Sequence, residues 1–122
     1  MTDIVGNLRR RREMLESLLG SEKKEKILLF IFTHVESYAR EIARTFNFNL
    51  NTVQNQLLNL ERGGILYSKL RGKVRLFGIN PRYPFKKEME ELLKKSLIFV
   101  PEDEKRRLYT PRLRPRRTGK PL

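Results

Sequence analysis

Residues 37–68 read SYAREIARTFNFNLNTVQNQLLNLERGGILYS and contain two helical patterns separated by three residues. The first pattern spans 37–46, with Ser37 as a suitable N-cap and one apolar face. That face holds Tyr38, Ile42, Ala43 and Phe46. The tripeptide Asn47-Phe48-Asn49 then interrupts the pattern. We therefore expect a helix, a three-residue turn and a second helix that begins at about Leu50.

The second helix is expected over Leu50–Arg62, and its apolar side holds Val53, Leu57, Leu58 and Leu60. Gly63-Gly64 ends it, as a C-terminal glycine in left-handed geometry does. After the glycines the apolar period changes from that of a helix to that of a strand. This change predicts strands over 65–69 and Val74–Ile79, joined by a tight basic turn over 70–73.

Helical patterns also precede this region. Apolar residues at helical spacing predict a helix over 4–19, with Gly20 as its stop. A helix over 22–35 follows, with Ser21 as its N-cap. Its centre, 27–32, is apolar nearly all round and is expected to be the buried spine. The same six residues are compatible with a buried strand, but the charged lead-in 22–26 favours a helix.

The last predicted helix spans 85–99 and follows the turn sequence Asn80-Pro81-Arg82-Tyr83-Pro84. One face holds Met89, Leu92, Leu93, Leu97 and Ile98. Pro101 is expected to terminate this helix. The remaining sequence is rich in Pro and Arg, and its apolar content is too low for it to fold alone.

The charge of the chain is concentrated at its ends. It has 27 Lys and Arg against 14 Asp and Glu, a formal charge of +13, yet residues 13–104 hold 15 basic and 13 acidic side chains. Residues 1–12 add Arg9, Arg10, Arg11 and Arg12 against Asp3. Residues 105–122 add Lys105, Arg106, Arg107, Arg112, Arg114, Arg116, Arg117 and Lys120. Such arms bind polyanions, and nucleic acid is favoured over an acidic membrane surface or a solubility role.

Several classes of protein are disfavoured by what the sequence lacks. No run of about 18 apolar residues predicts a membrane span, and residues 1–6 do not resemble a secretory signal. The absence of cysteine excludes disulfides and thiolate metal sites and agrees with a cytoplasmic location. No nucleotide-binding or hydrolase motif occurs, and the lone His34 is expected to pack or to lie at the surface rather than bind metal. We expect neither an enzyme nor a cofactor.

The order of elements resembles a winged helix-turn-helix, in particular the arsenic-repressor-like (ArsR-like) regulators of bacteria and archaea. Residues 38–44 resemble the first helix of the family's helix pair, and 49–57 resemble the start of its recognition helix. Residues 60–66 resemble the passage from that helix into the wing. The resemblance implies a mainly α fold with a small β-hairpin, although the metal-binding cysteines of the best-known members are missing.

This resemblance divides the chain into four parts. Residues 1–20 are expected to form an N-terminal helix, and residues 21–82 are expected to form the winged helix-turn-helix. A C-terminal helix occupies 83–100, and a basic tail without regular structure occupies 101–122. The apolar faces of the two flanking helices exceed what one small domain needs. Related regulators dimerise through such helices, so a homodimer that reads two DNA half-sites about one helical turn apart is expected.

The non-core face of the predicted recognition helix is rich in amides and carries no charge. It holds Asn49, Asn51, Thr52, Gln54, Asn55, Gln56 and Asn59. Asn and Gln pair bidentately with adenine in the major groove, so these residues are candidates for reading A·T pairs. A merely solvated face is the alternative, but such a face more often holds Glu, Lys or Ala. Capping alone explains Asn49.

Basic residues beside this helix are candidates for phosphate contact. The predicted wing carries Lys69, Arg71, Lys73 and Arg75 around Gly72, which suits phosphate or minor-groove contact as well as a solvated turn. Arg40 and Arg44 are placed to contact phosphates or to pair with Glu36 and Glu41.

The sequence therefore favours a regulator that binds double-stranded DNA at specific sequences, with repression as the expected outcome. The first alternative is a structural or assembly protein that coats nucleic acid without choosing sequence. An RNA-binding protein is less favoured, because an A-form major groove does not admit the amide face. No effector ligand is indicated.

Overall fold

The computed structural model describes residues 15–109, which form a mainly helical fold with a small three-stranded antiparallel sheet. The elements are α2 (Glu16–Leu19), α3 (Glu22–His34), β1 (Glu36–Ser37), α4 (Ala39–Phe46), α5 (Leu50–Arg62), β2 (Leu66–Arg71), β3 (Val74–Ile79), α6 (Lys86–Ser96), the 3-10 turn η1 (Leu97–Phe99) and α7 (Glu102–Tyr109). Most of the helix predicted over 4–19 lies outside the described residues, and α2 is its last turn. None of the described helices is long and apolar enough to cross a membrane.

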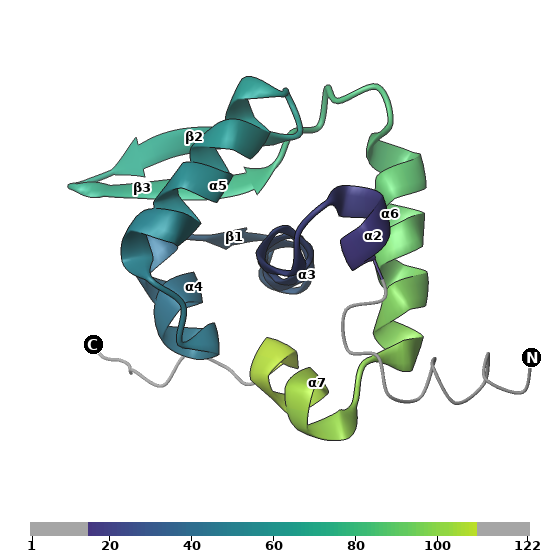
Figure 1. The fold of residues 1–122 in the computed structure, drawn as a ribbon. Coiled ribbons are helices and arrows are strands. Elements are labelled where there is room, and N and C mark those ends of the chain that lie inside the picture. Colours follow the sequence, from purple (N-terminus) through teal and green to yellow (C-terminus); the bar gives the residue numbers. More distant parts are fainter. Residues whose placement is uncertain (1–14, 110–122) are drawn as a thin grey trace, which may run out of the picture.

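Helix α3 is the centre of the fold, as its apolar sequence predicts. In Figure 1 it is seen end-on, with α5 and the sheet on one side, α6 on the other and α7 beneath, and all of these contact it. Every side chain from Glu25 to Ile31 is buried. The Ser21 hydroxyl accepts a hydrogen bond from the Lys24 backbone N–H at 3.1 Å, so the predicted N-cap is confirmed. The helical interpretation of 27–32 is therefore correct and the strand alternative is wrong.

The helix pair α4 and α5 is joined by the predicted three-residue turn. Asn47 takes the left-handed conformation, with φ of 60°, and the Phe48 N–H donates to the Ala43 carbonyl at 2.9 Å. At the far end of α5 it is Gly64, with φ of 83°, that is left-handed. The Ile65 N–H donates to the Leu60 carbonyl at 3.0 Å. This bond gives a carbonyl in the last turn of α5 a partner, and the chain then continues into β2.

The sheet differs from the predicted hairpin in two respects. Strand β1 adds to β3 through the pairs Glu36↔Gly78 and Ser37↔Phe77, giving the order β1-β3-β2. The hairpin pairs from Leu66↔Ile79 to Arg71↔Val74, so the connecting turn is only Gly72-Lys73 and not 70–73. The left-handed Gly72, with φ of 65°, allows the shorter turn.

The prediction that Ser37 caps α4 is wrong, because Ser37 belongs to a strand. Tyr38 occupies the N-cap position and makes no side-chain capping bond. The Ser37 hydroxyl instead donates to the Glu41 carboxylate at 2.7 Å, and both residues are buried. This bond ties β1 to the first turn of α4.

The prediction that the chain after Pro101 forms a tail without regular structure is wrong for 102–109. Helix α7 begins directly after Pro101, whose carbonyl accepts from the Lys105 N–H at 2.8 Å. Glu104 and Leu108 of α7 are buried against α3. The Lys26 ammonium lies 2.9 Å from the Glu104 carboxylate, and the Thr33 hydroxyl donates to the Leu108 carbonyl at 3.3 Å. Residues 110–122 lie outside the described residues.

The predicted apolar face of the helix over 85–99 is only partly buried. Leu93 and Leu97 belong to the core and Met89 packs against it. Leu92 and Ile98 are exposed, together with Phe99. The helical stretch reaches Phe99 as predicted, but its last turn, η1, is a 3-10 turn rather than α-helix.

Candidate nucleic-acid interface

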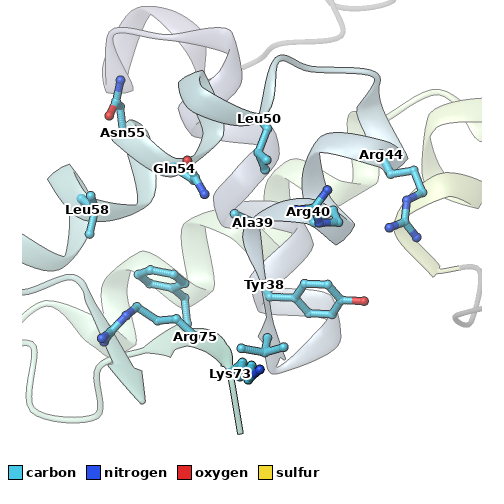
Figure 2. Close-up of a pocket in the computed structure, with 12 residues that line it drawn as sticks. Tyr38, Ala39, Arg40, Arg44, Leu50, Gln54, Asn55, Leu58, Lys73 and Arg75 are labelled. Carbon is cyan, nitrogen blue, oxygen red and sulfur yellow. The ribbon is translucent and has the colours of Figure 1, made fainter. Parts of the chain in front are cut away.

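A surface groove of about 660 Å³ lies between α4, α5 and the tip of the β2–β3 hairpin (Figure 2). Helices α4 and α5 are joined by the three-residue turn, and the fold brings the hairpin, which is more distant from α4 in sequence, beside them to form the groove. It is lined by Tyr38, Ala39, Arg40, Arg44, Leu50, Gln54, Asn55, Leu58, Lys73, Val74, Arg75 and Phe77.

The groove carries positive charge only. Its charged side chains are Arg40 and Arg44 from α4, Lys73 from the hairpin turn and Arg75 from β3, and no acidic residue lines it. All four are exposed. Cations collected around a concave surface raise the local potential and attract an anionic ligand. The arrangement therefore favours a polyanion over a neutral or cationic partner.

The position of each α5 side chain follows from the helical period. Val53, Leu57 and Leu60 are fully buried and fix the core face. Leu50, Gln54 and Leu58, four residues apart, form a row that faces the groove. Figure 2 shows this row along α5, with Asn55 projecting from the outer edge of the same helix.

Of the amides that the sequence singled out, the groove brings together only Gln54 and Asn55. The Asn49 side chain accepts a hydrogen bond from the Thr52 N–H at 3.2 Å, so its oxygen caps α5 as predicted. Asn51 and Asn59 are exposed outside the groove. Thr52 and Gln56 are half-buried and likewise do not line it. Only two residues of the predicted amide face of α5, Gln54 and Asn55, therefore line the groove.

The four predicted basic residues of the hairpin are divided in the same way. Lys73 and Arg75 line the groove, whereas Lys69 and Arg71 do not. The Lys69 ammonium is 3.0 Å from the Glu36 carboxylate on β1, so its charge is already paired. Arg71 is exposed at the end of β2, directly before the Gly72-Lys73 turn. The tip of the hairpin therefore presents Arg71 and Lys73 outward.

Glu36 is the acceptor of a small network that links β1 to the hairpin. The Tyr67 hydroxyl donates to its carboxylate, and Lys69 bonds the same oxygen. The bond from the Tyr67 hydroxyl, and then the bond from Lys69, hold the pKa of Glu36 below its ordinary value of 4.5. Burial, reinforced by the bond to Glu36, raises the pKa of Tyr67 to about 12. Glu36 is therefore ionised and Tyr67 protonated at neutral pH.

The ring of Tyr67 lies directly over Gly78, its partner on β3. A Cβ at Gly78 would fall 2.5 Å from the Tyr67 hydroxyl oxygen and 2.6 Å from Cζ. Only glycine leaves room for this approach. The absence of a side chain at position 78 thus allows Tyr67 to reach Glu36.

A second network, which the sequence did not predict, joins α5 to the hairpin. The Ser68 hydroxyl donates to the Glu61 carboxylate at 2.7 Å. The Arg75 guanidinium donates to the same hydroxyl at 2.9 Å. Arg75 is thereby linked through Ser68 of β2 to Glu61 of α5, which positions one of the four groove cations relative to α5. No periodicity in the sequence signals this contact, because it depends on the register of β2 against β3.

Two predictions of burial are wrong at the groove. Leu58 was expected on the apolar side of α5, but it is 43% exposed and lines the groove. Tyr38 was expected on the buried face of α4, but it is only half-buried and also lines the groove. His34 packs as predicted, its ring stacked on Phe30 with centroids 3.9 Å apart. Within residues 15–109 no group of three or more His, Asp and Glu is placed to hold a metal.

Comparison of the chain with models of protein families, with curated proteins and with solved structures found no match.

Proposed function

We propose that this chain is a winged helix-turn-helix protein that binds double-stranded DNA at specific sequences and regulates transcription, with α5 as its recognition helix. The order α3, β1, α4, turn, α5, β2, β3 is compatible with that of the ArsR-like regulators that residues 38–66 resemble. The proposed protein lacks their thiolate metal site, because the chain has no cysteine.

The groove is the observation that carries this proposal. It places uncharged amides of one helix beside four cations from two other elements. DNA requires both kinds of group, since cations neutralise phosphates without reading sequence and amides read base edges. A site for a small anion or for nucleic acid of any sequence needs no amides on an exposed helix.

In the proposed complex α5 enters the major groove and Gln54 and Asn55 bond adenine N6 and N7. Arg40 and Arg44 contact the phosphates of one strand from α4. Arg75, which donates to the Ser68 hydroxyl, contacts the DNA phosphates from β3. Arg71 and Lys73, at the tip of the hairpin, contact phosphates or the adjacent minor groove. Asn51 is exposed one turn before Asn55 and is available as a further amide.

We further propose a homodimer that acts as a repressor. Leu92, Ile98 and Phe99 form exposed apolar surface on α6 and η1, away from the groove-forming elements. Burial of this surface against a second copy would present two α5 helices to two half-sites. A domain that occupies such a site excludes other proteins from it. Light scattering of the wild type and of Ile98→Asp tests the dimer, which the substitution is expected to dissociate.

The alternative is a structural protein that coats nucleic acid without choosing sequence. The concentration of basic residues at the two ends of the chain favours it, since residues 110–122 hold Arg112, Arg114, Arg116, Arg117 and Lys120 and no acid. In that case affinity depends on the ends and the groove contributes little.

Selection from a random duplex pool at about 200 mM salt separates the two functions. The proteins compared are the full chain and a truncation after residue 109, because α7 packs on α3 and must be kept. We expect both forms to enrich one short motif, with the truncated form binding more weakly and with a shallower salt dependence. Binding that enriches no motif and is lost with residues 110–122 would overturn the regulator and support the structural protein.

A further inference from the structure

Leu58 is a large apolar side chain on the exposed part of α5. It is 43% exposed, whereas the neighbouring Leu57 and Leu60 are buried. Single exposed leucines are common on protein surfaces and need no explanation by themselves. The surroundings of Leu58 distinguish it from the other exposed leucines.

Leu58 is the next residue after Gln54 in the row that faces the groove. It follows Gln54 by four positions and Asn55 by three, so both amides are its neighbours on the helix surface. All three side chains line the groove, and Figure 2 shows Leu58 and Gln54 along the same side of α5. A base edge that meets Gln54 or Asn55 therefore brings the adjacent base edge close to Leu58.

The groove has apolar lining besides Leu58. Leu50, Val74 and Phe77 also line it, together with the four cations of α4 and the hairpin. A phosphate does not favour such a surface, because it would lose water without gaining a donor. A ligand in the groove therefore meets both the apolar side chain of Leu58 and the hydrogen-bonding amides of Gln54 and Asn55.

From this arrangement we infer that Leu58 reads thymine, by packing against the C5-methyl group in the major groove. The inference rests on the proposed function and adds a specificity-determining residue to it. The thymine methyl is the apolar group that the four bases present in the major groove. Adenine recognition by Gln54 or Asn55 places the thymine of the same or the neighbouring pair within the reach of α5. Leu58 and the amides then select A·T pairs by two independent contacts.

The test replaces thymine by deoxyuridine, which pairs identically and lacks only the methyl group. The probe is the duplex most enriched from the random pool by the wild type, together with copies in which one thymine at a time is replaced. The variants are Leu58→Ala and, as a control, Leu18→Ala, which removes an exposed leucine (68%) on α2, outside both the groove and the proposed dimer surface. Leu58→Ala keeps helix propensity, and circular dichroism checks that it folds.

The wild type is expected to lose about fourfold in affinity at one or two thymines, the effect of burying one methyl-sized group. Leu58→Ala is expected to bind the thymine and deoxyuridine duplexes equally at those positions, while Leu18→Ala retains the fourfold ratio. A ratio that persists in Leu58→Ala, or a wild type indifferent to every replacement, would overturn the inference and leave the regulator standing. A pool that yields no motif would overturn the proposed function, and the inference with it.

Discussion

The buried ion pair between Lys26 and Glu104 gives a quantitative test of the position of α7. Its two side chains are 10% and 7% exposed, and the ammonium and carboxylate lie 2.9 Å apart. Replacing Glu104 by Leu leaves the charge of Lys26 buried without this partner. Removal of one member of a buried pair costs about 3–5 kcal/mol of unfolding free energy. Because both side chains retain some contact with water, we expect about 3 kcal/mol.

For a domain of about 100 residues, each kcal/mol lowers the Tm by roughly 4 °C. Glu104→Leu is therefore expected to melt about 12 °C below the wild type, and urea denaturation measures the free energy directly. The double variant Lys26→Met with Glu104→Leu is expected to recover the wild-type stability, because two apolar side chains of similar volume replace the pair.

The matched control is Glu90→Leu, which breaks the exposed pair with Lys86, whose side chains are 37% and 30% exposed. This change is expected to cost no more than about 0.5 kcal/mol. A loss of unfolding free energy in Glu104→Leu that is no larger than the loss in Glu90→Leu would contradict the prediction. The reasoning is also wrong if the double variant is as unstable as Glu104→Leu alone, since the loss then does not come from the unpaired charge.

Three further predictions concern the hairpin and the groove. Tyr67→Phe is expected to raise the pKa of Glu36, because the Tyr67 hydroxyl is the largest cause of its lowering. The bonds to ionised Glu36 stabilise the fold above pH 4.5, and this stabilisation is lost as the pH falls through the lowered pKa. An NMR titration in which the pKa of Glu36 is the same in Tyr67→Phe as in the wild type would contradict this prediction. Gly78→Ala is expected to displace the Tyr67 ring and to cost about 1–3 kcal/mol in urea denaturation, and an unchanged midpoint would show that the ring adjusts freely. Arg40→Ala and Lys73→Ala are each expected to reduce the slope of log K against log salt by about 0.9, and a wild-type slope would mean that neither contacts a phosphate.

Much of the fold follows from local signals in the sequence. The boundaries of α5 were predictable because Asn49 caps its start and the glycines after Arg62 end it. The turn at 47–49 was predictable because two apolar periods meet there out of phase. Helix α7 has no apolar period, since one buried leucine and a buried ion pair attach it to α3, and only Pro101 and the acidic first turn at 102–104 mark its start. A buried glutamate looks the same in the sequence as an exposed one.

The candidate site was predictable by residue type but not by position. Consecutive residues of a helix are rotated by about 100°, so Leu57 and Leu58 cannot both point into a narrow core. Val53, Leu57 and Leu60 fill the core, and Leu58 is left in the groove. Which amides share the groove with the cations depends on where α4 and the hairpin lie against α5. That arrangement is tertiary, and the sequence of α5 alone does not contain it.

The measurement that tests the central claim most directly is the sequence preference of a Gln54→Ala, Asn55→Ala variant against that of Gln56→Ala. Gln56 is an amide of the same helix that does not line the groove. Each protein is assayed on the enriched duplex and on a scrambled duplex at about 200 mM salt.

The groove account predicts that the Gln54→Ala, Asn55→Ala variant keeps its affinity for scrambled DNA and loses its preference for the motif. Each lost amide–adenine contact is worth about 1–3 kcal/mol, or roughly fivefold or more in the ratio of the two affinities. Gln56→Ala is expected to keep the wild-type ratio. An unchanged ratio in the Gln54→Ala, Asn55→Ala variant would contradict the account.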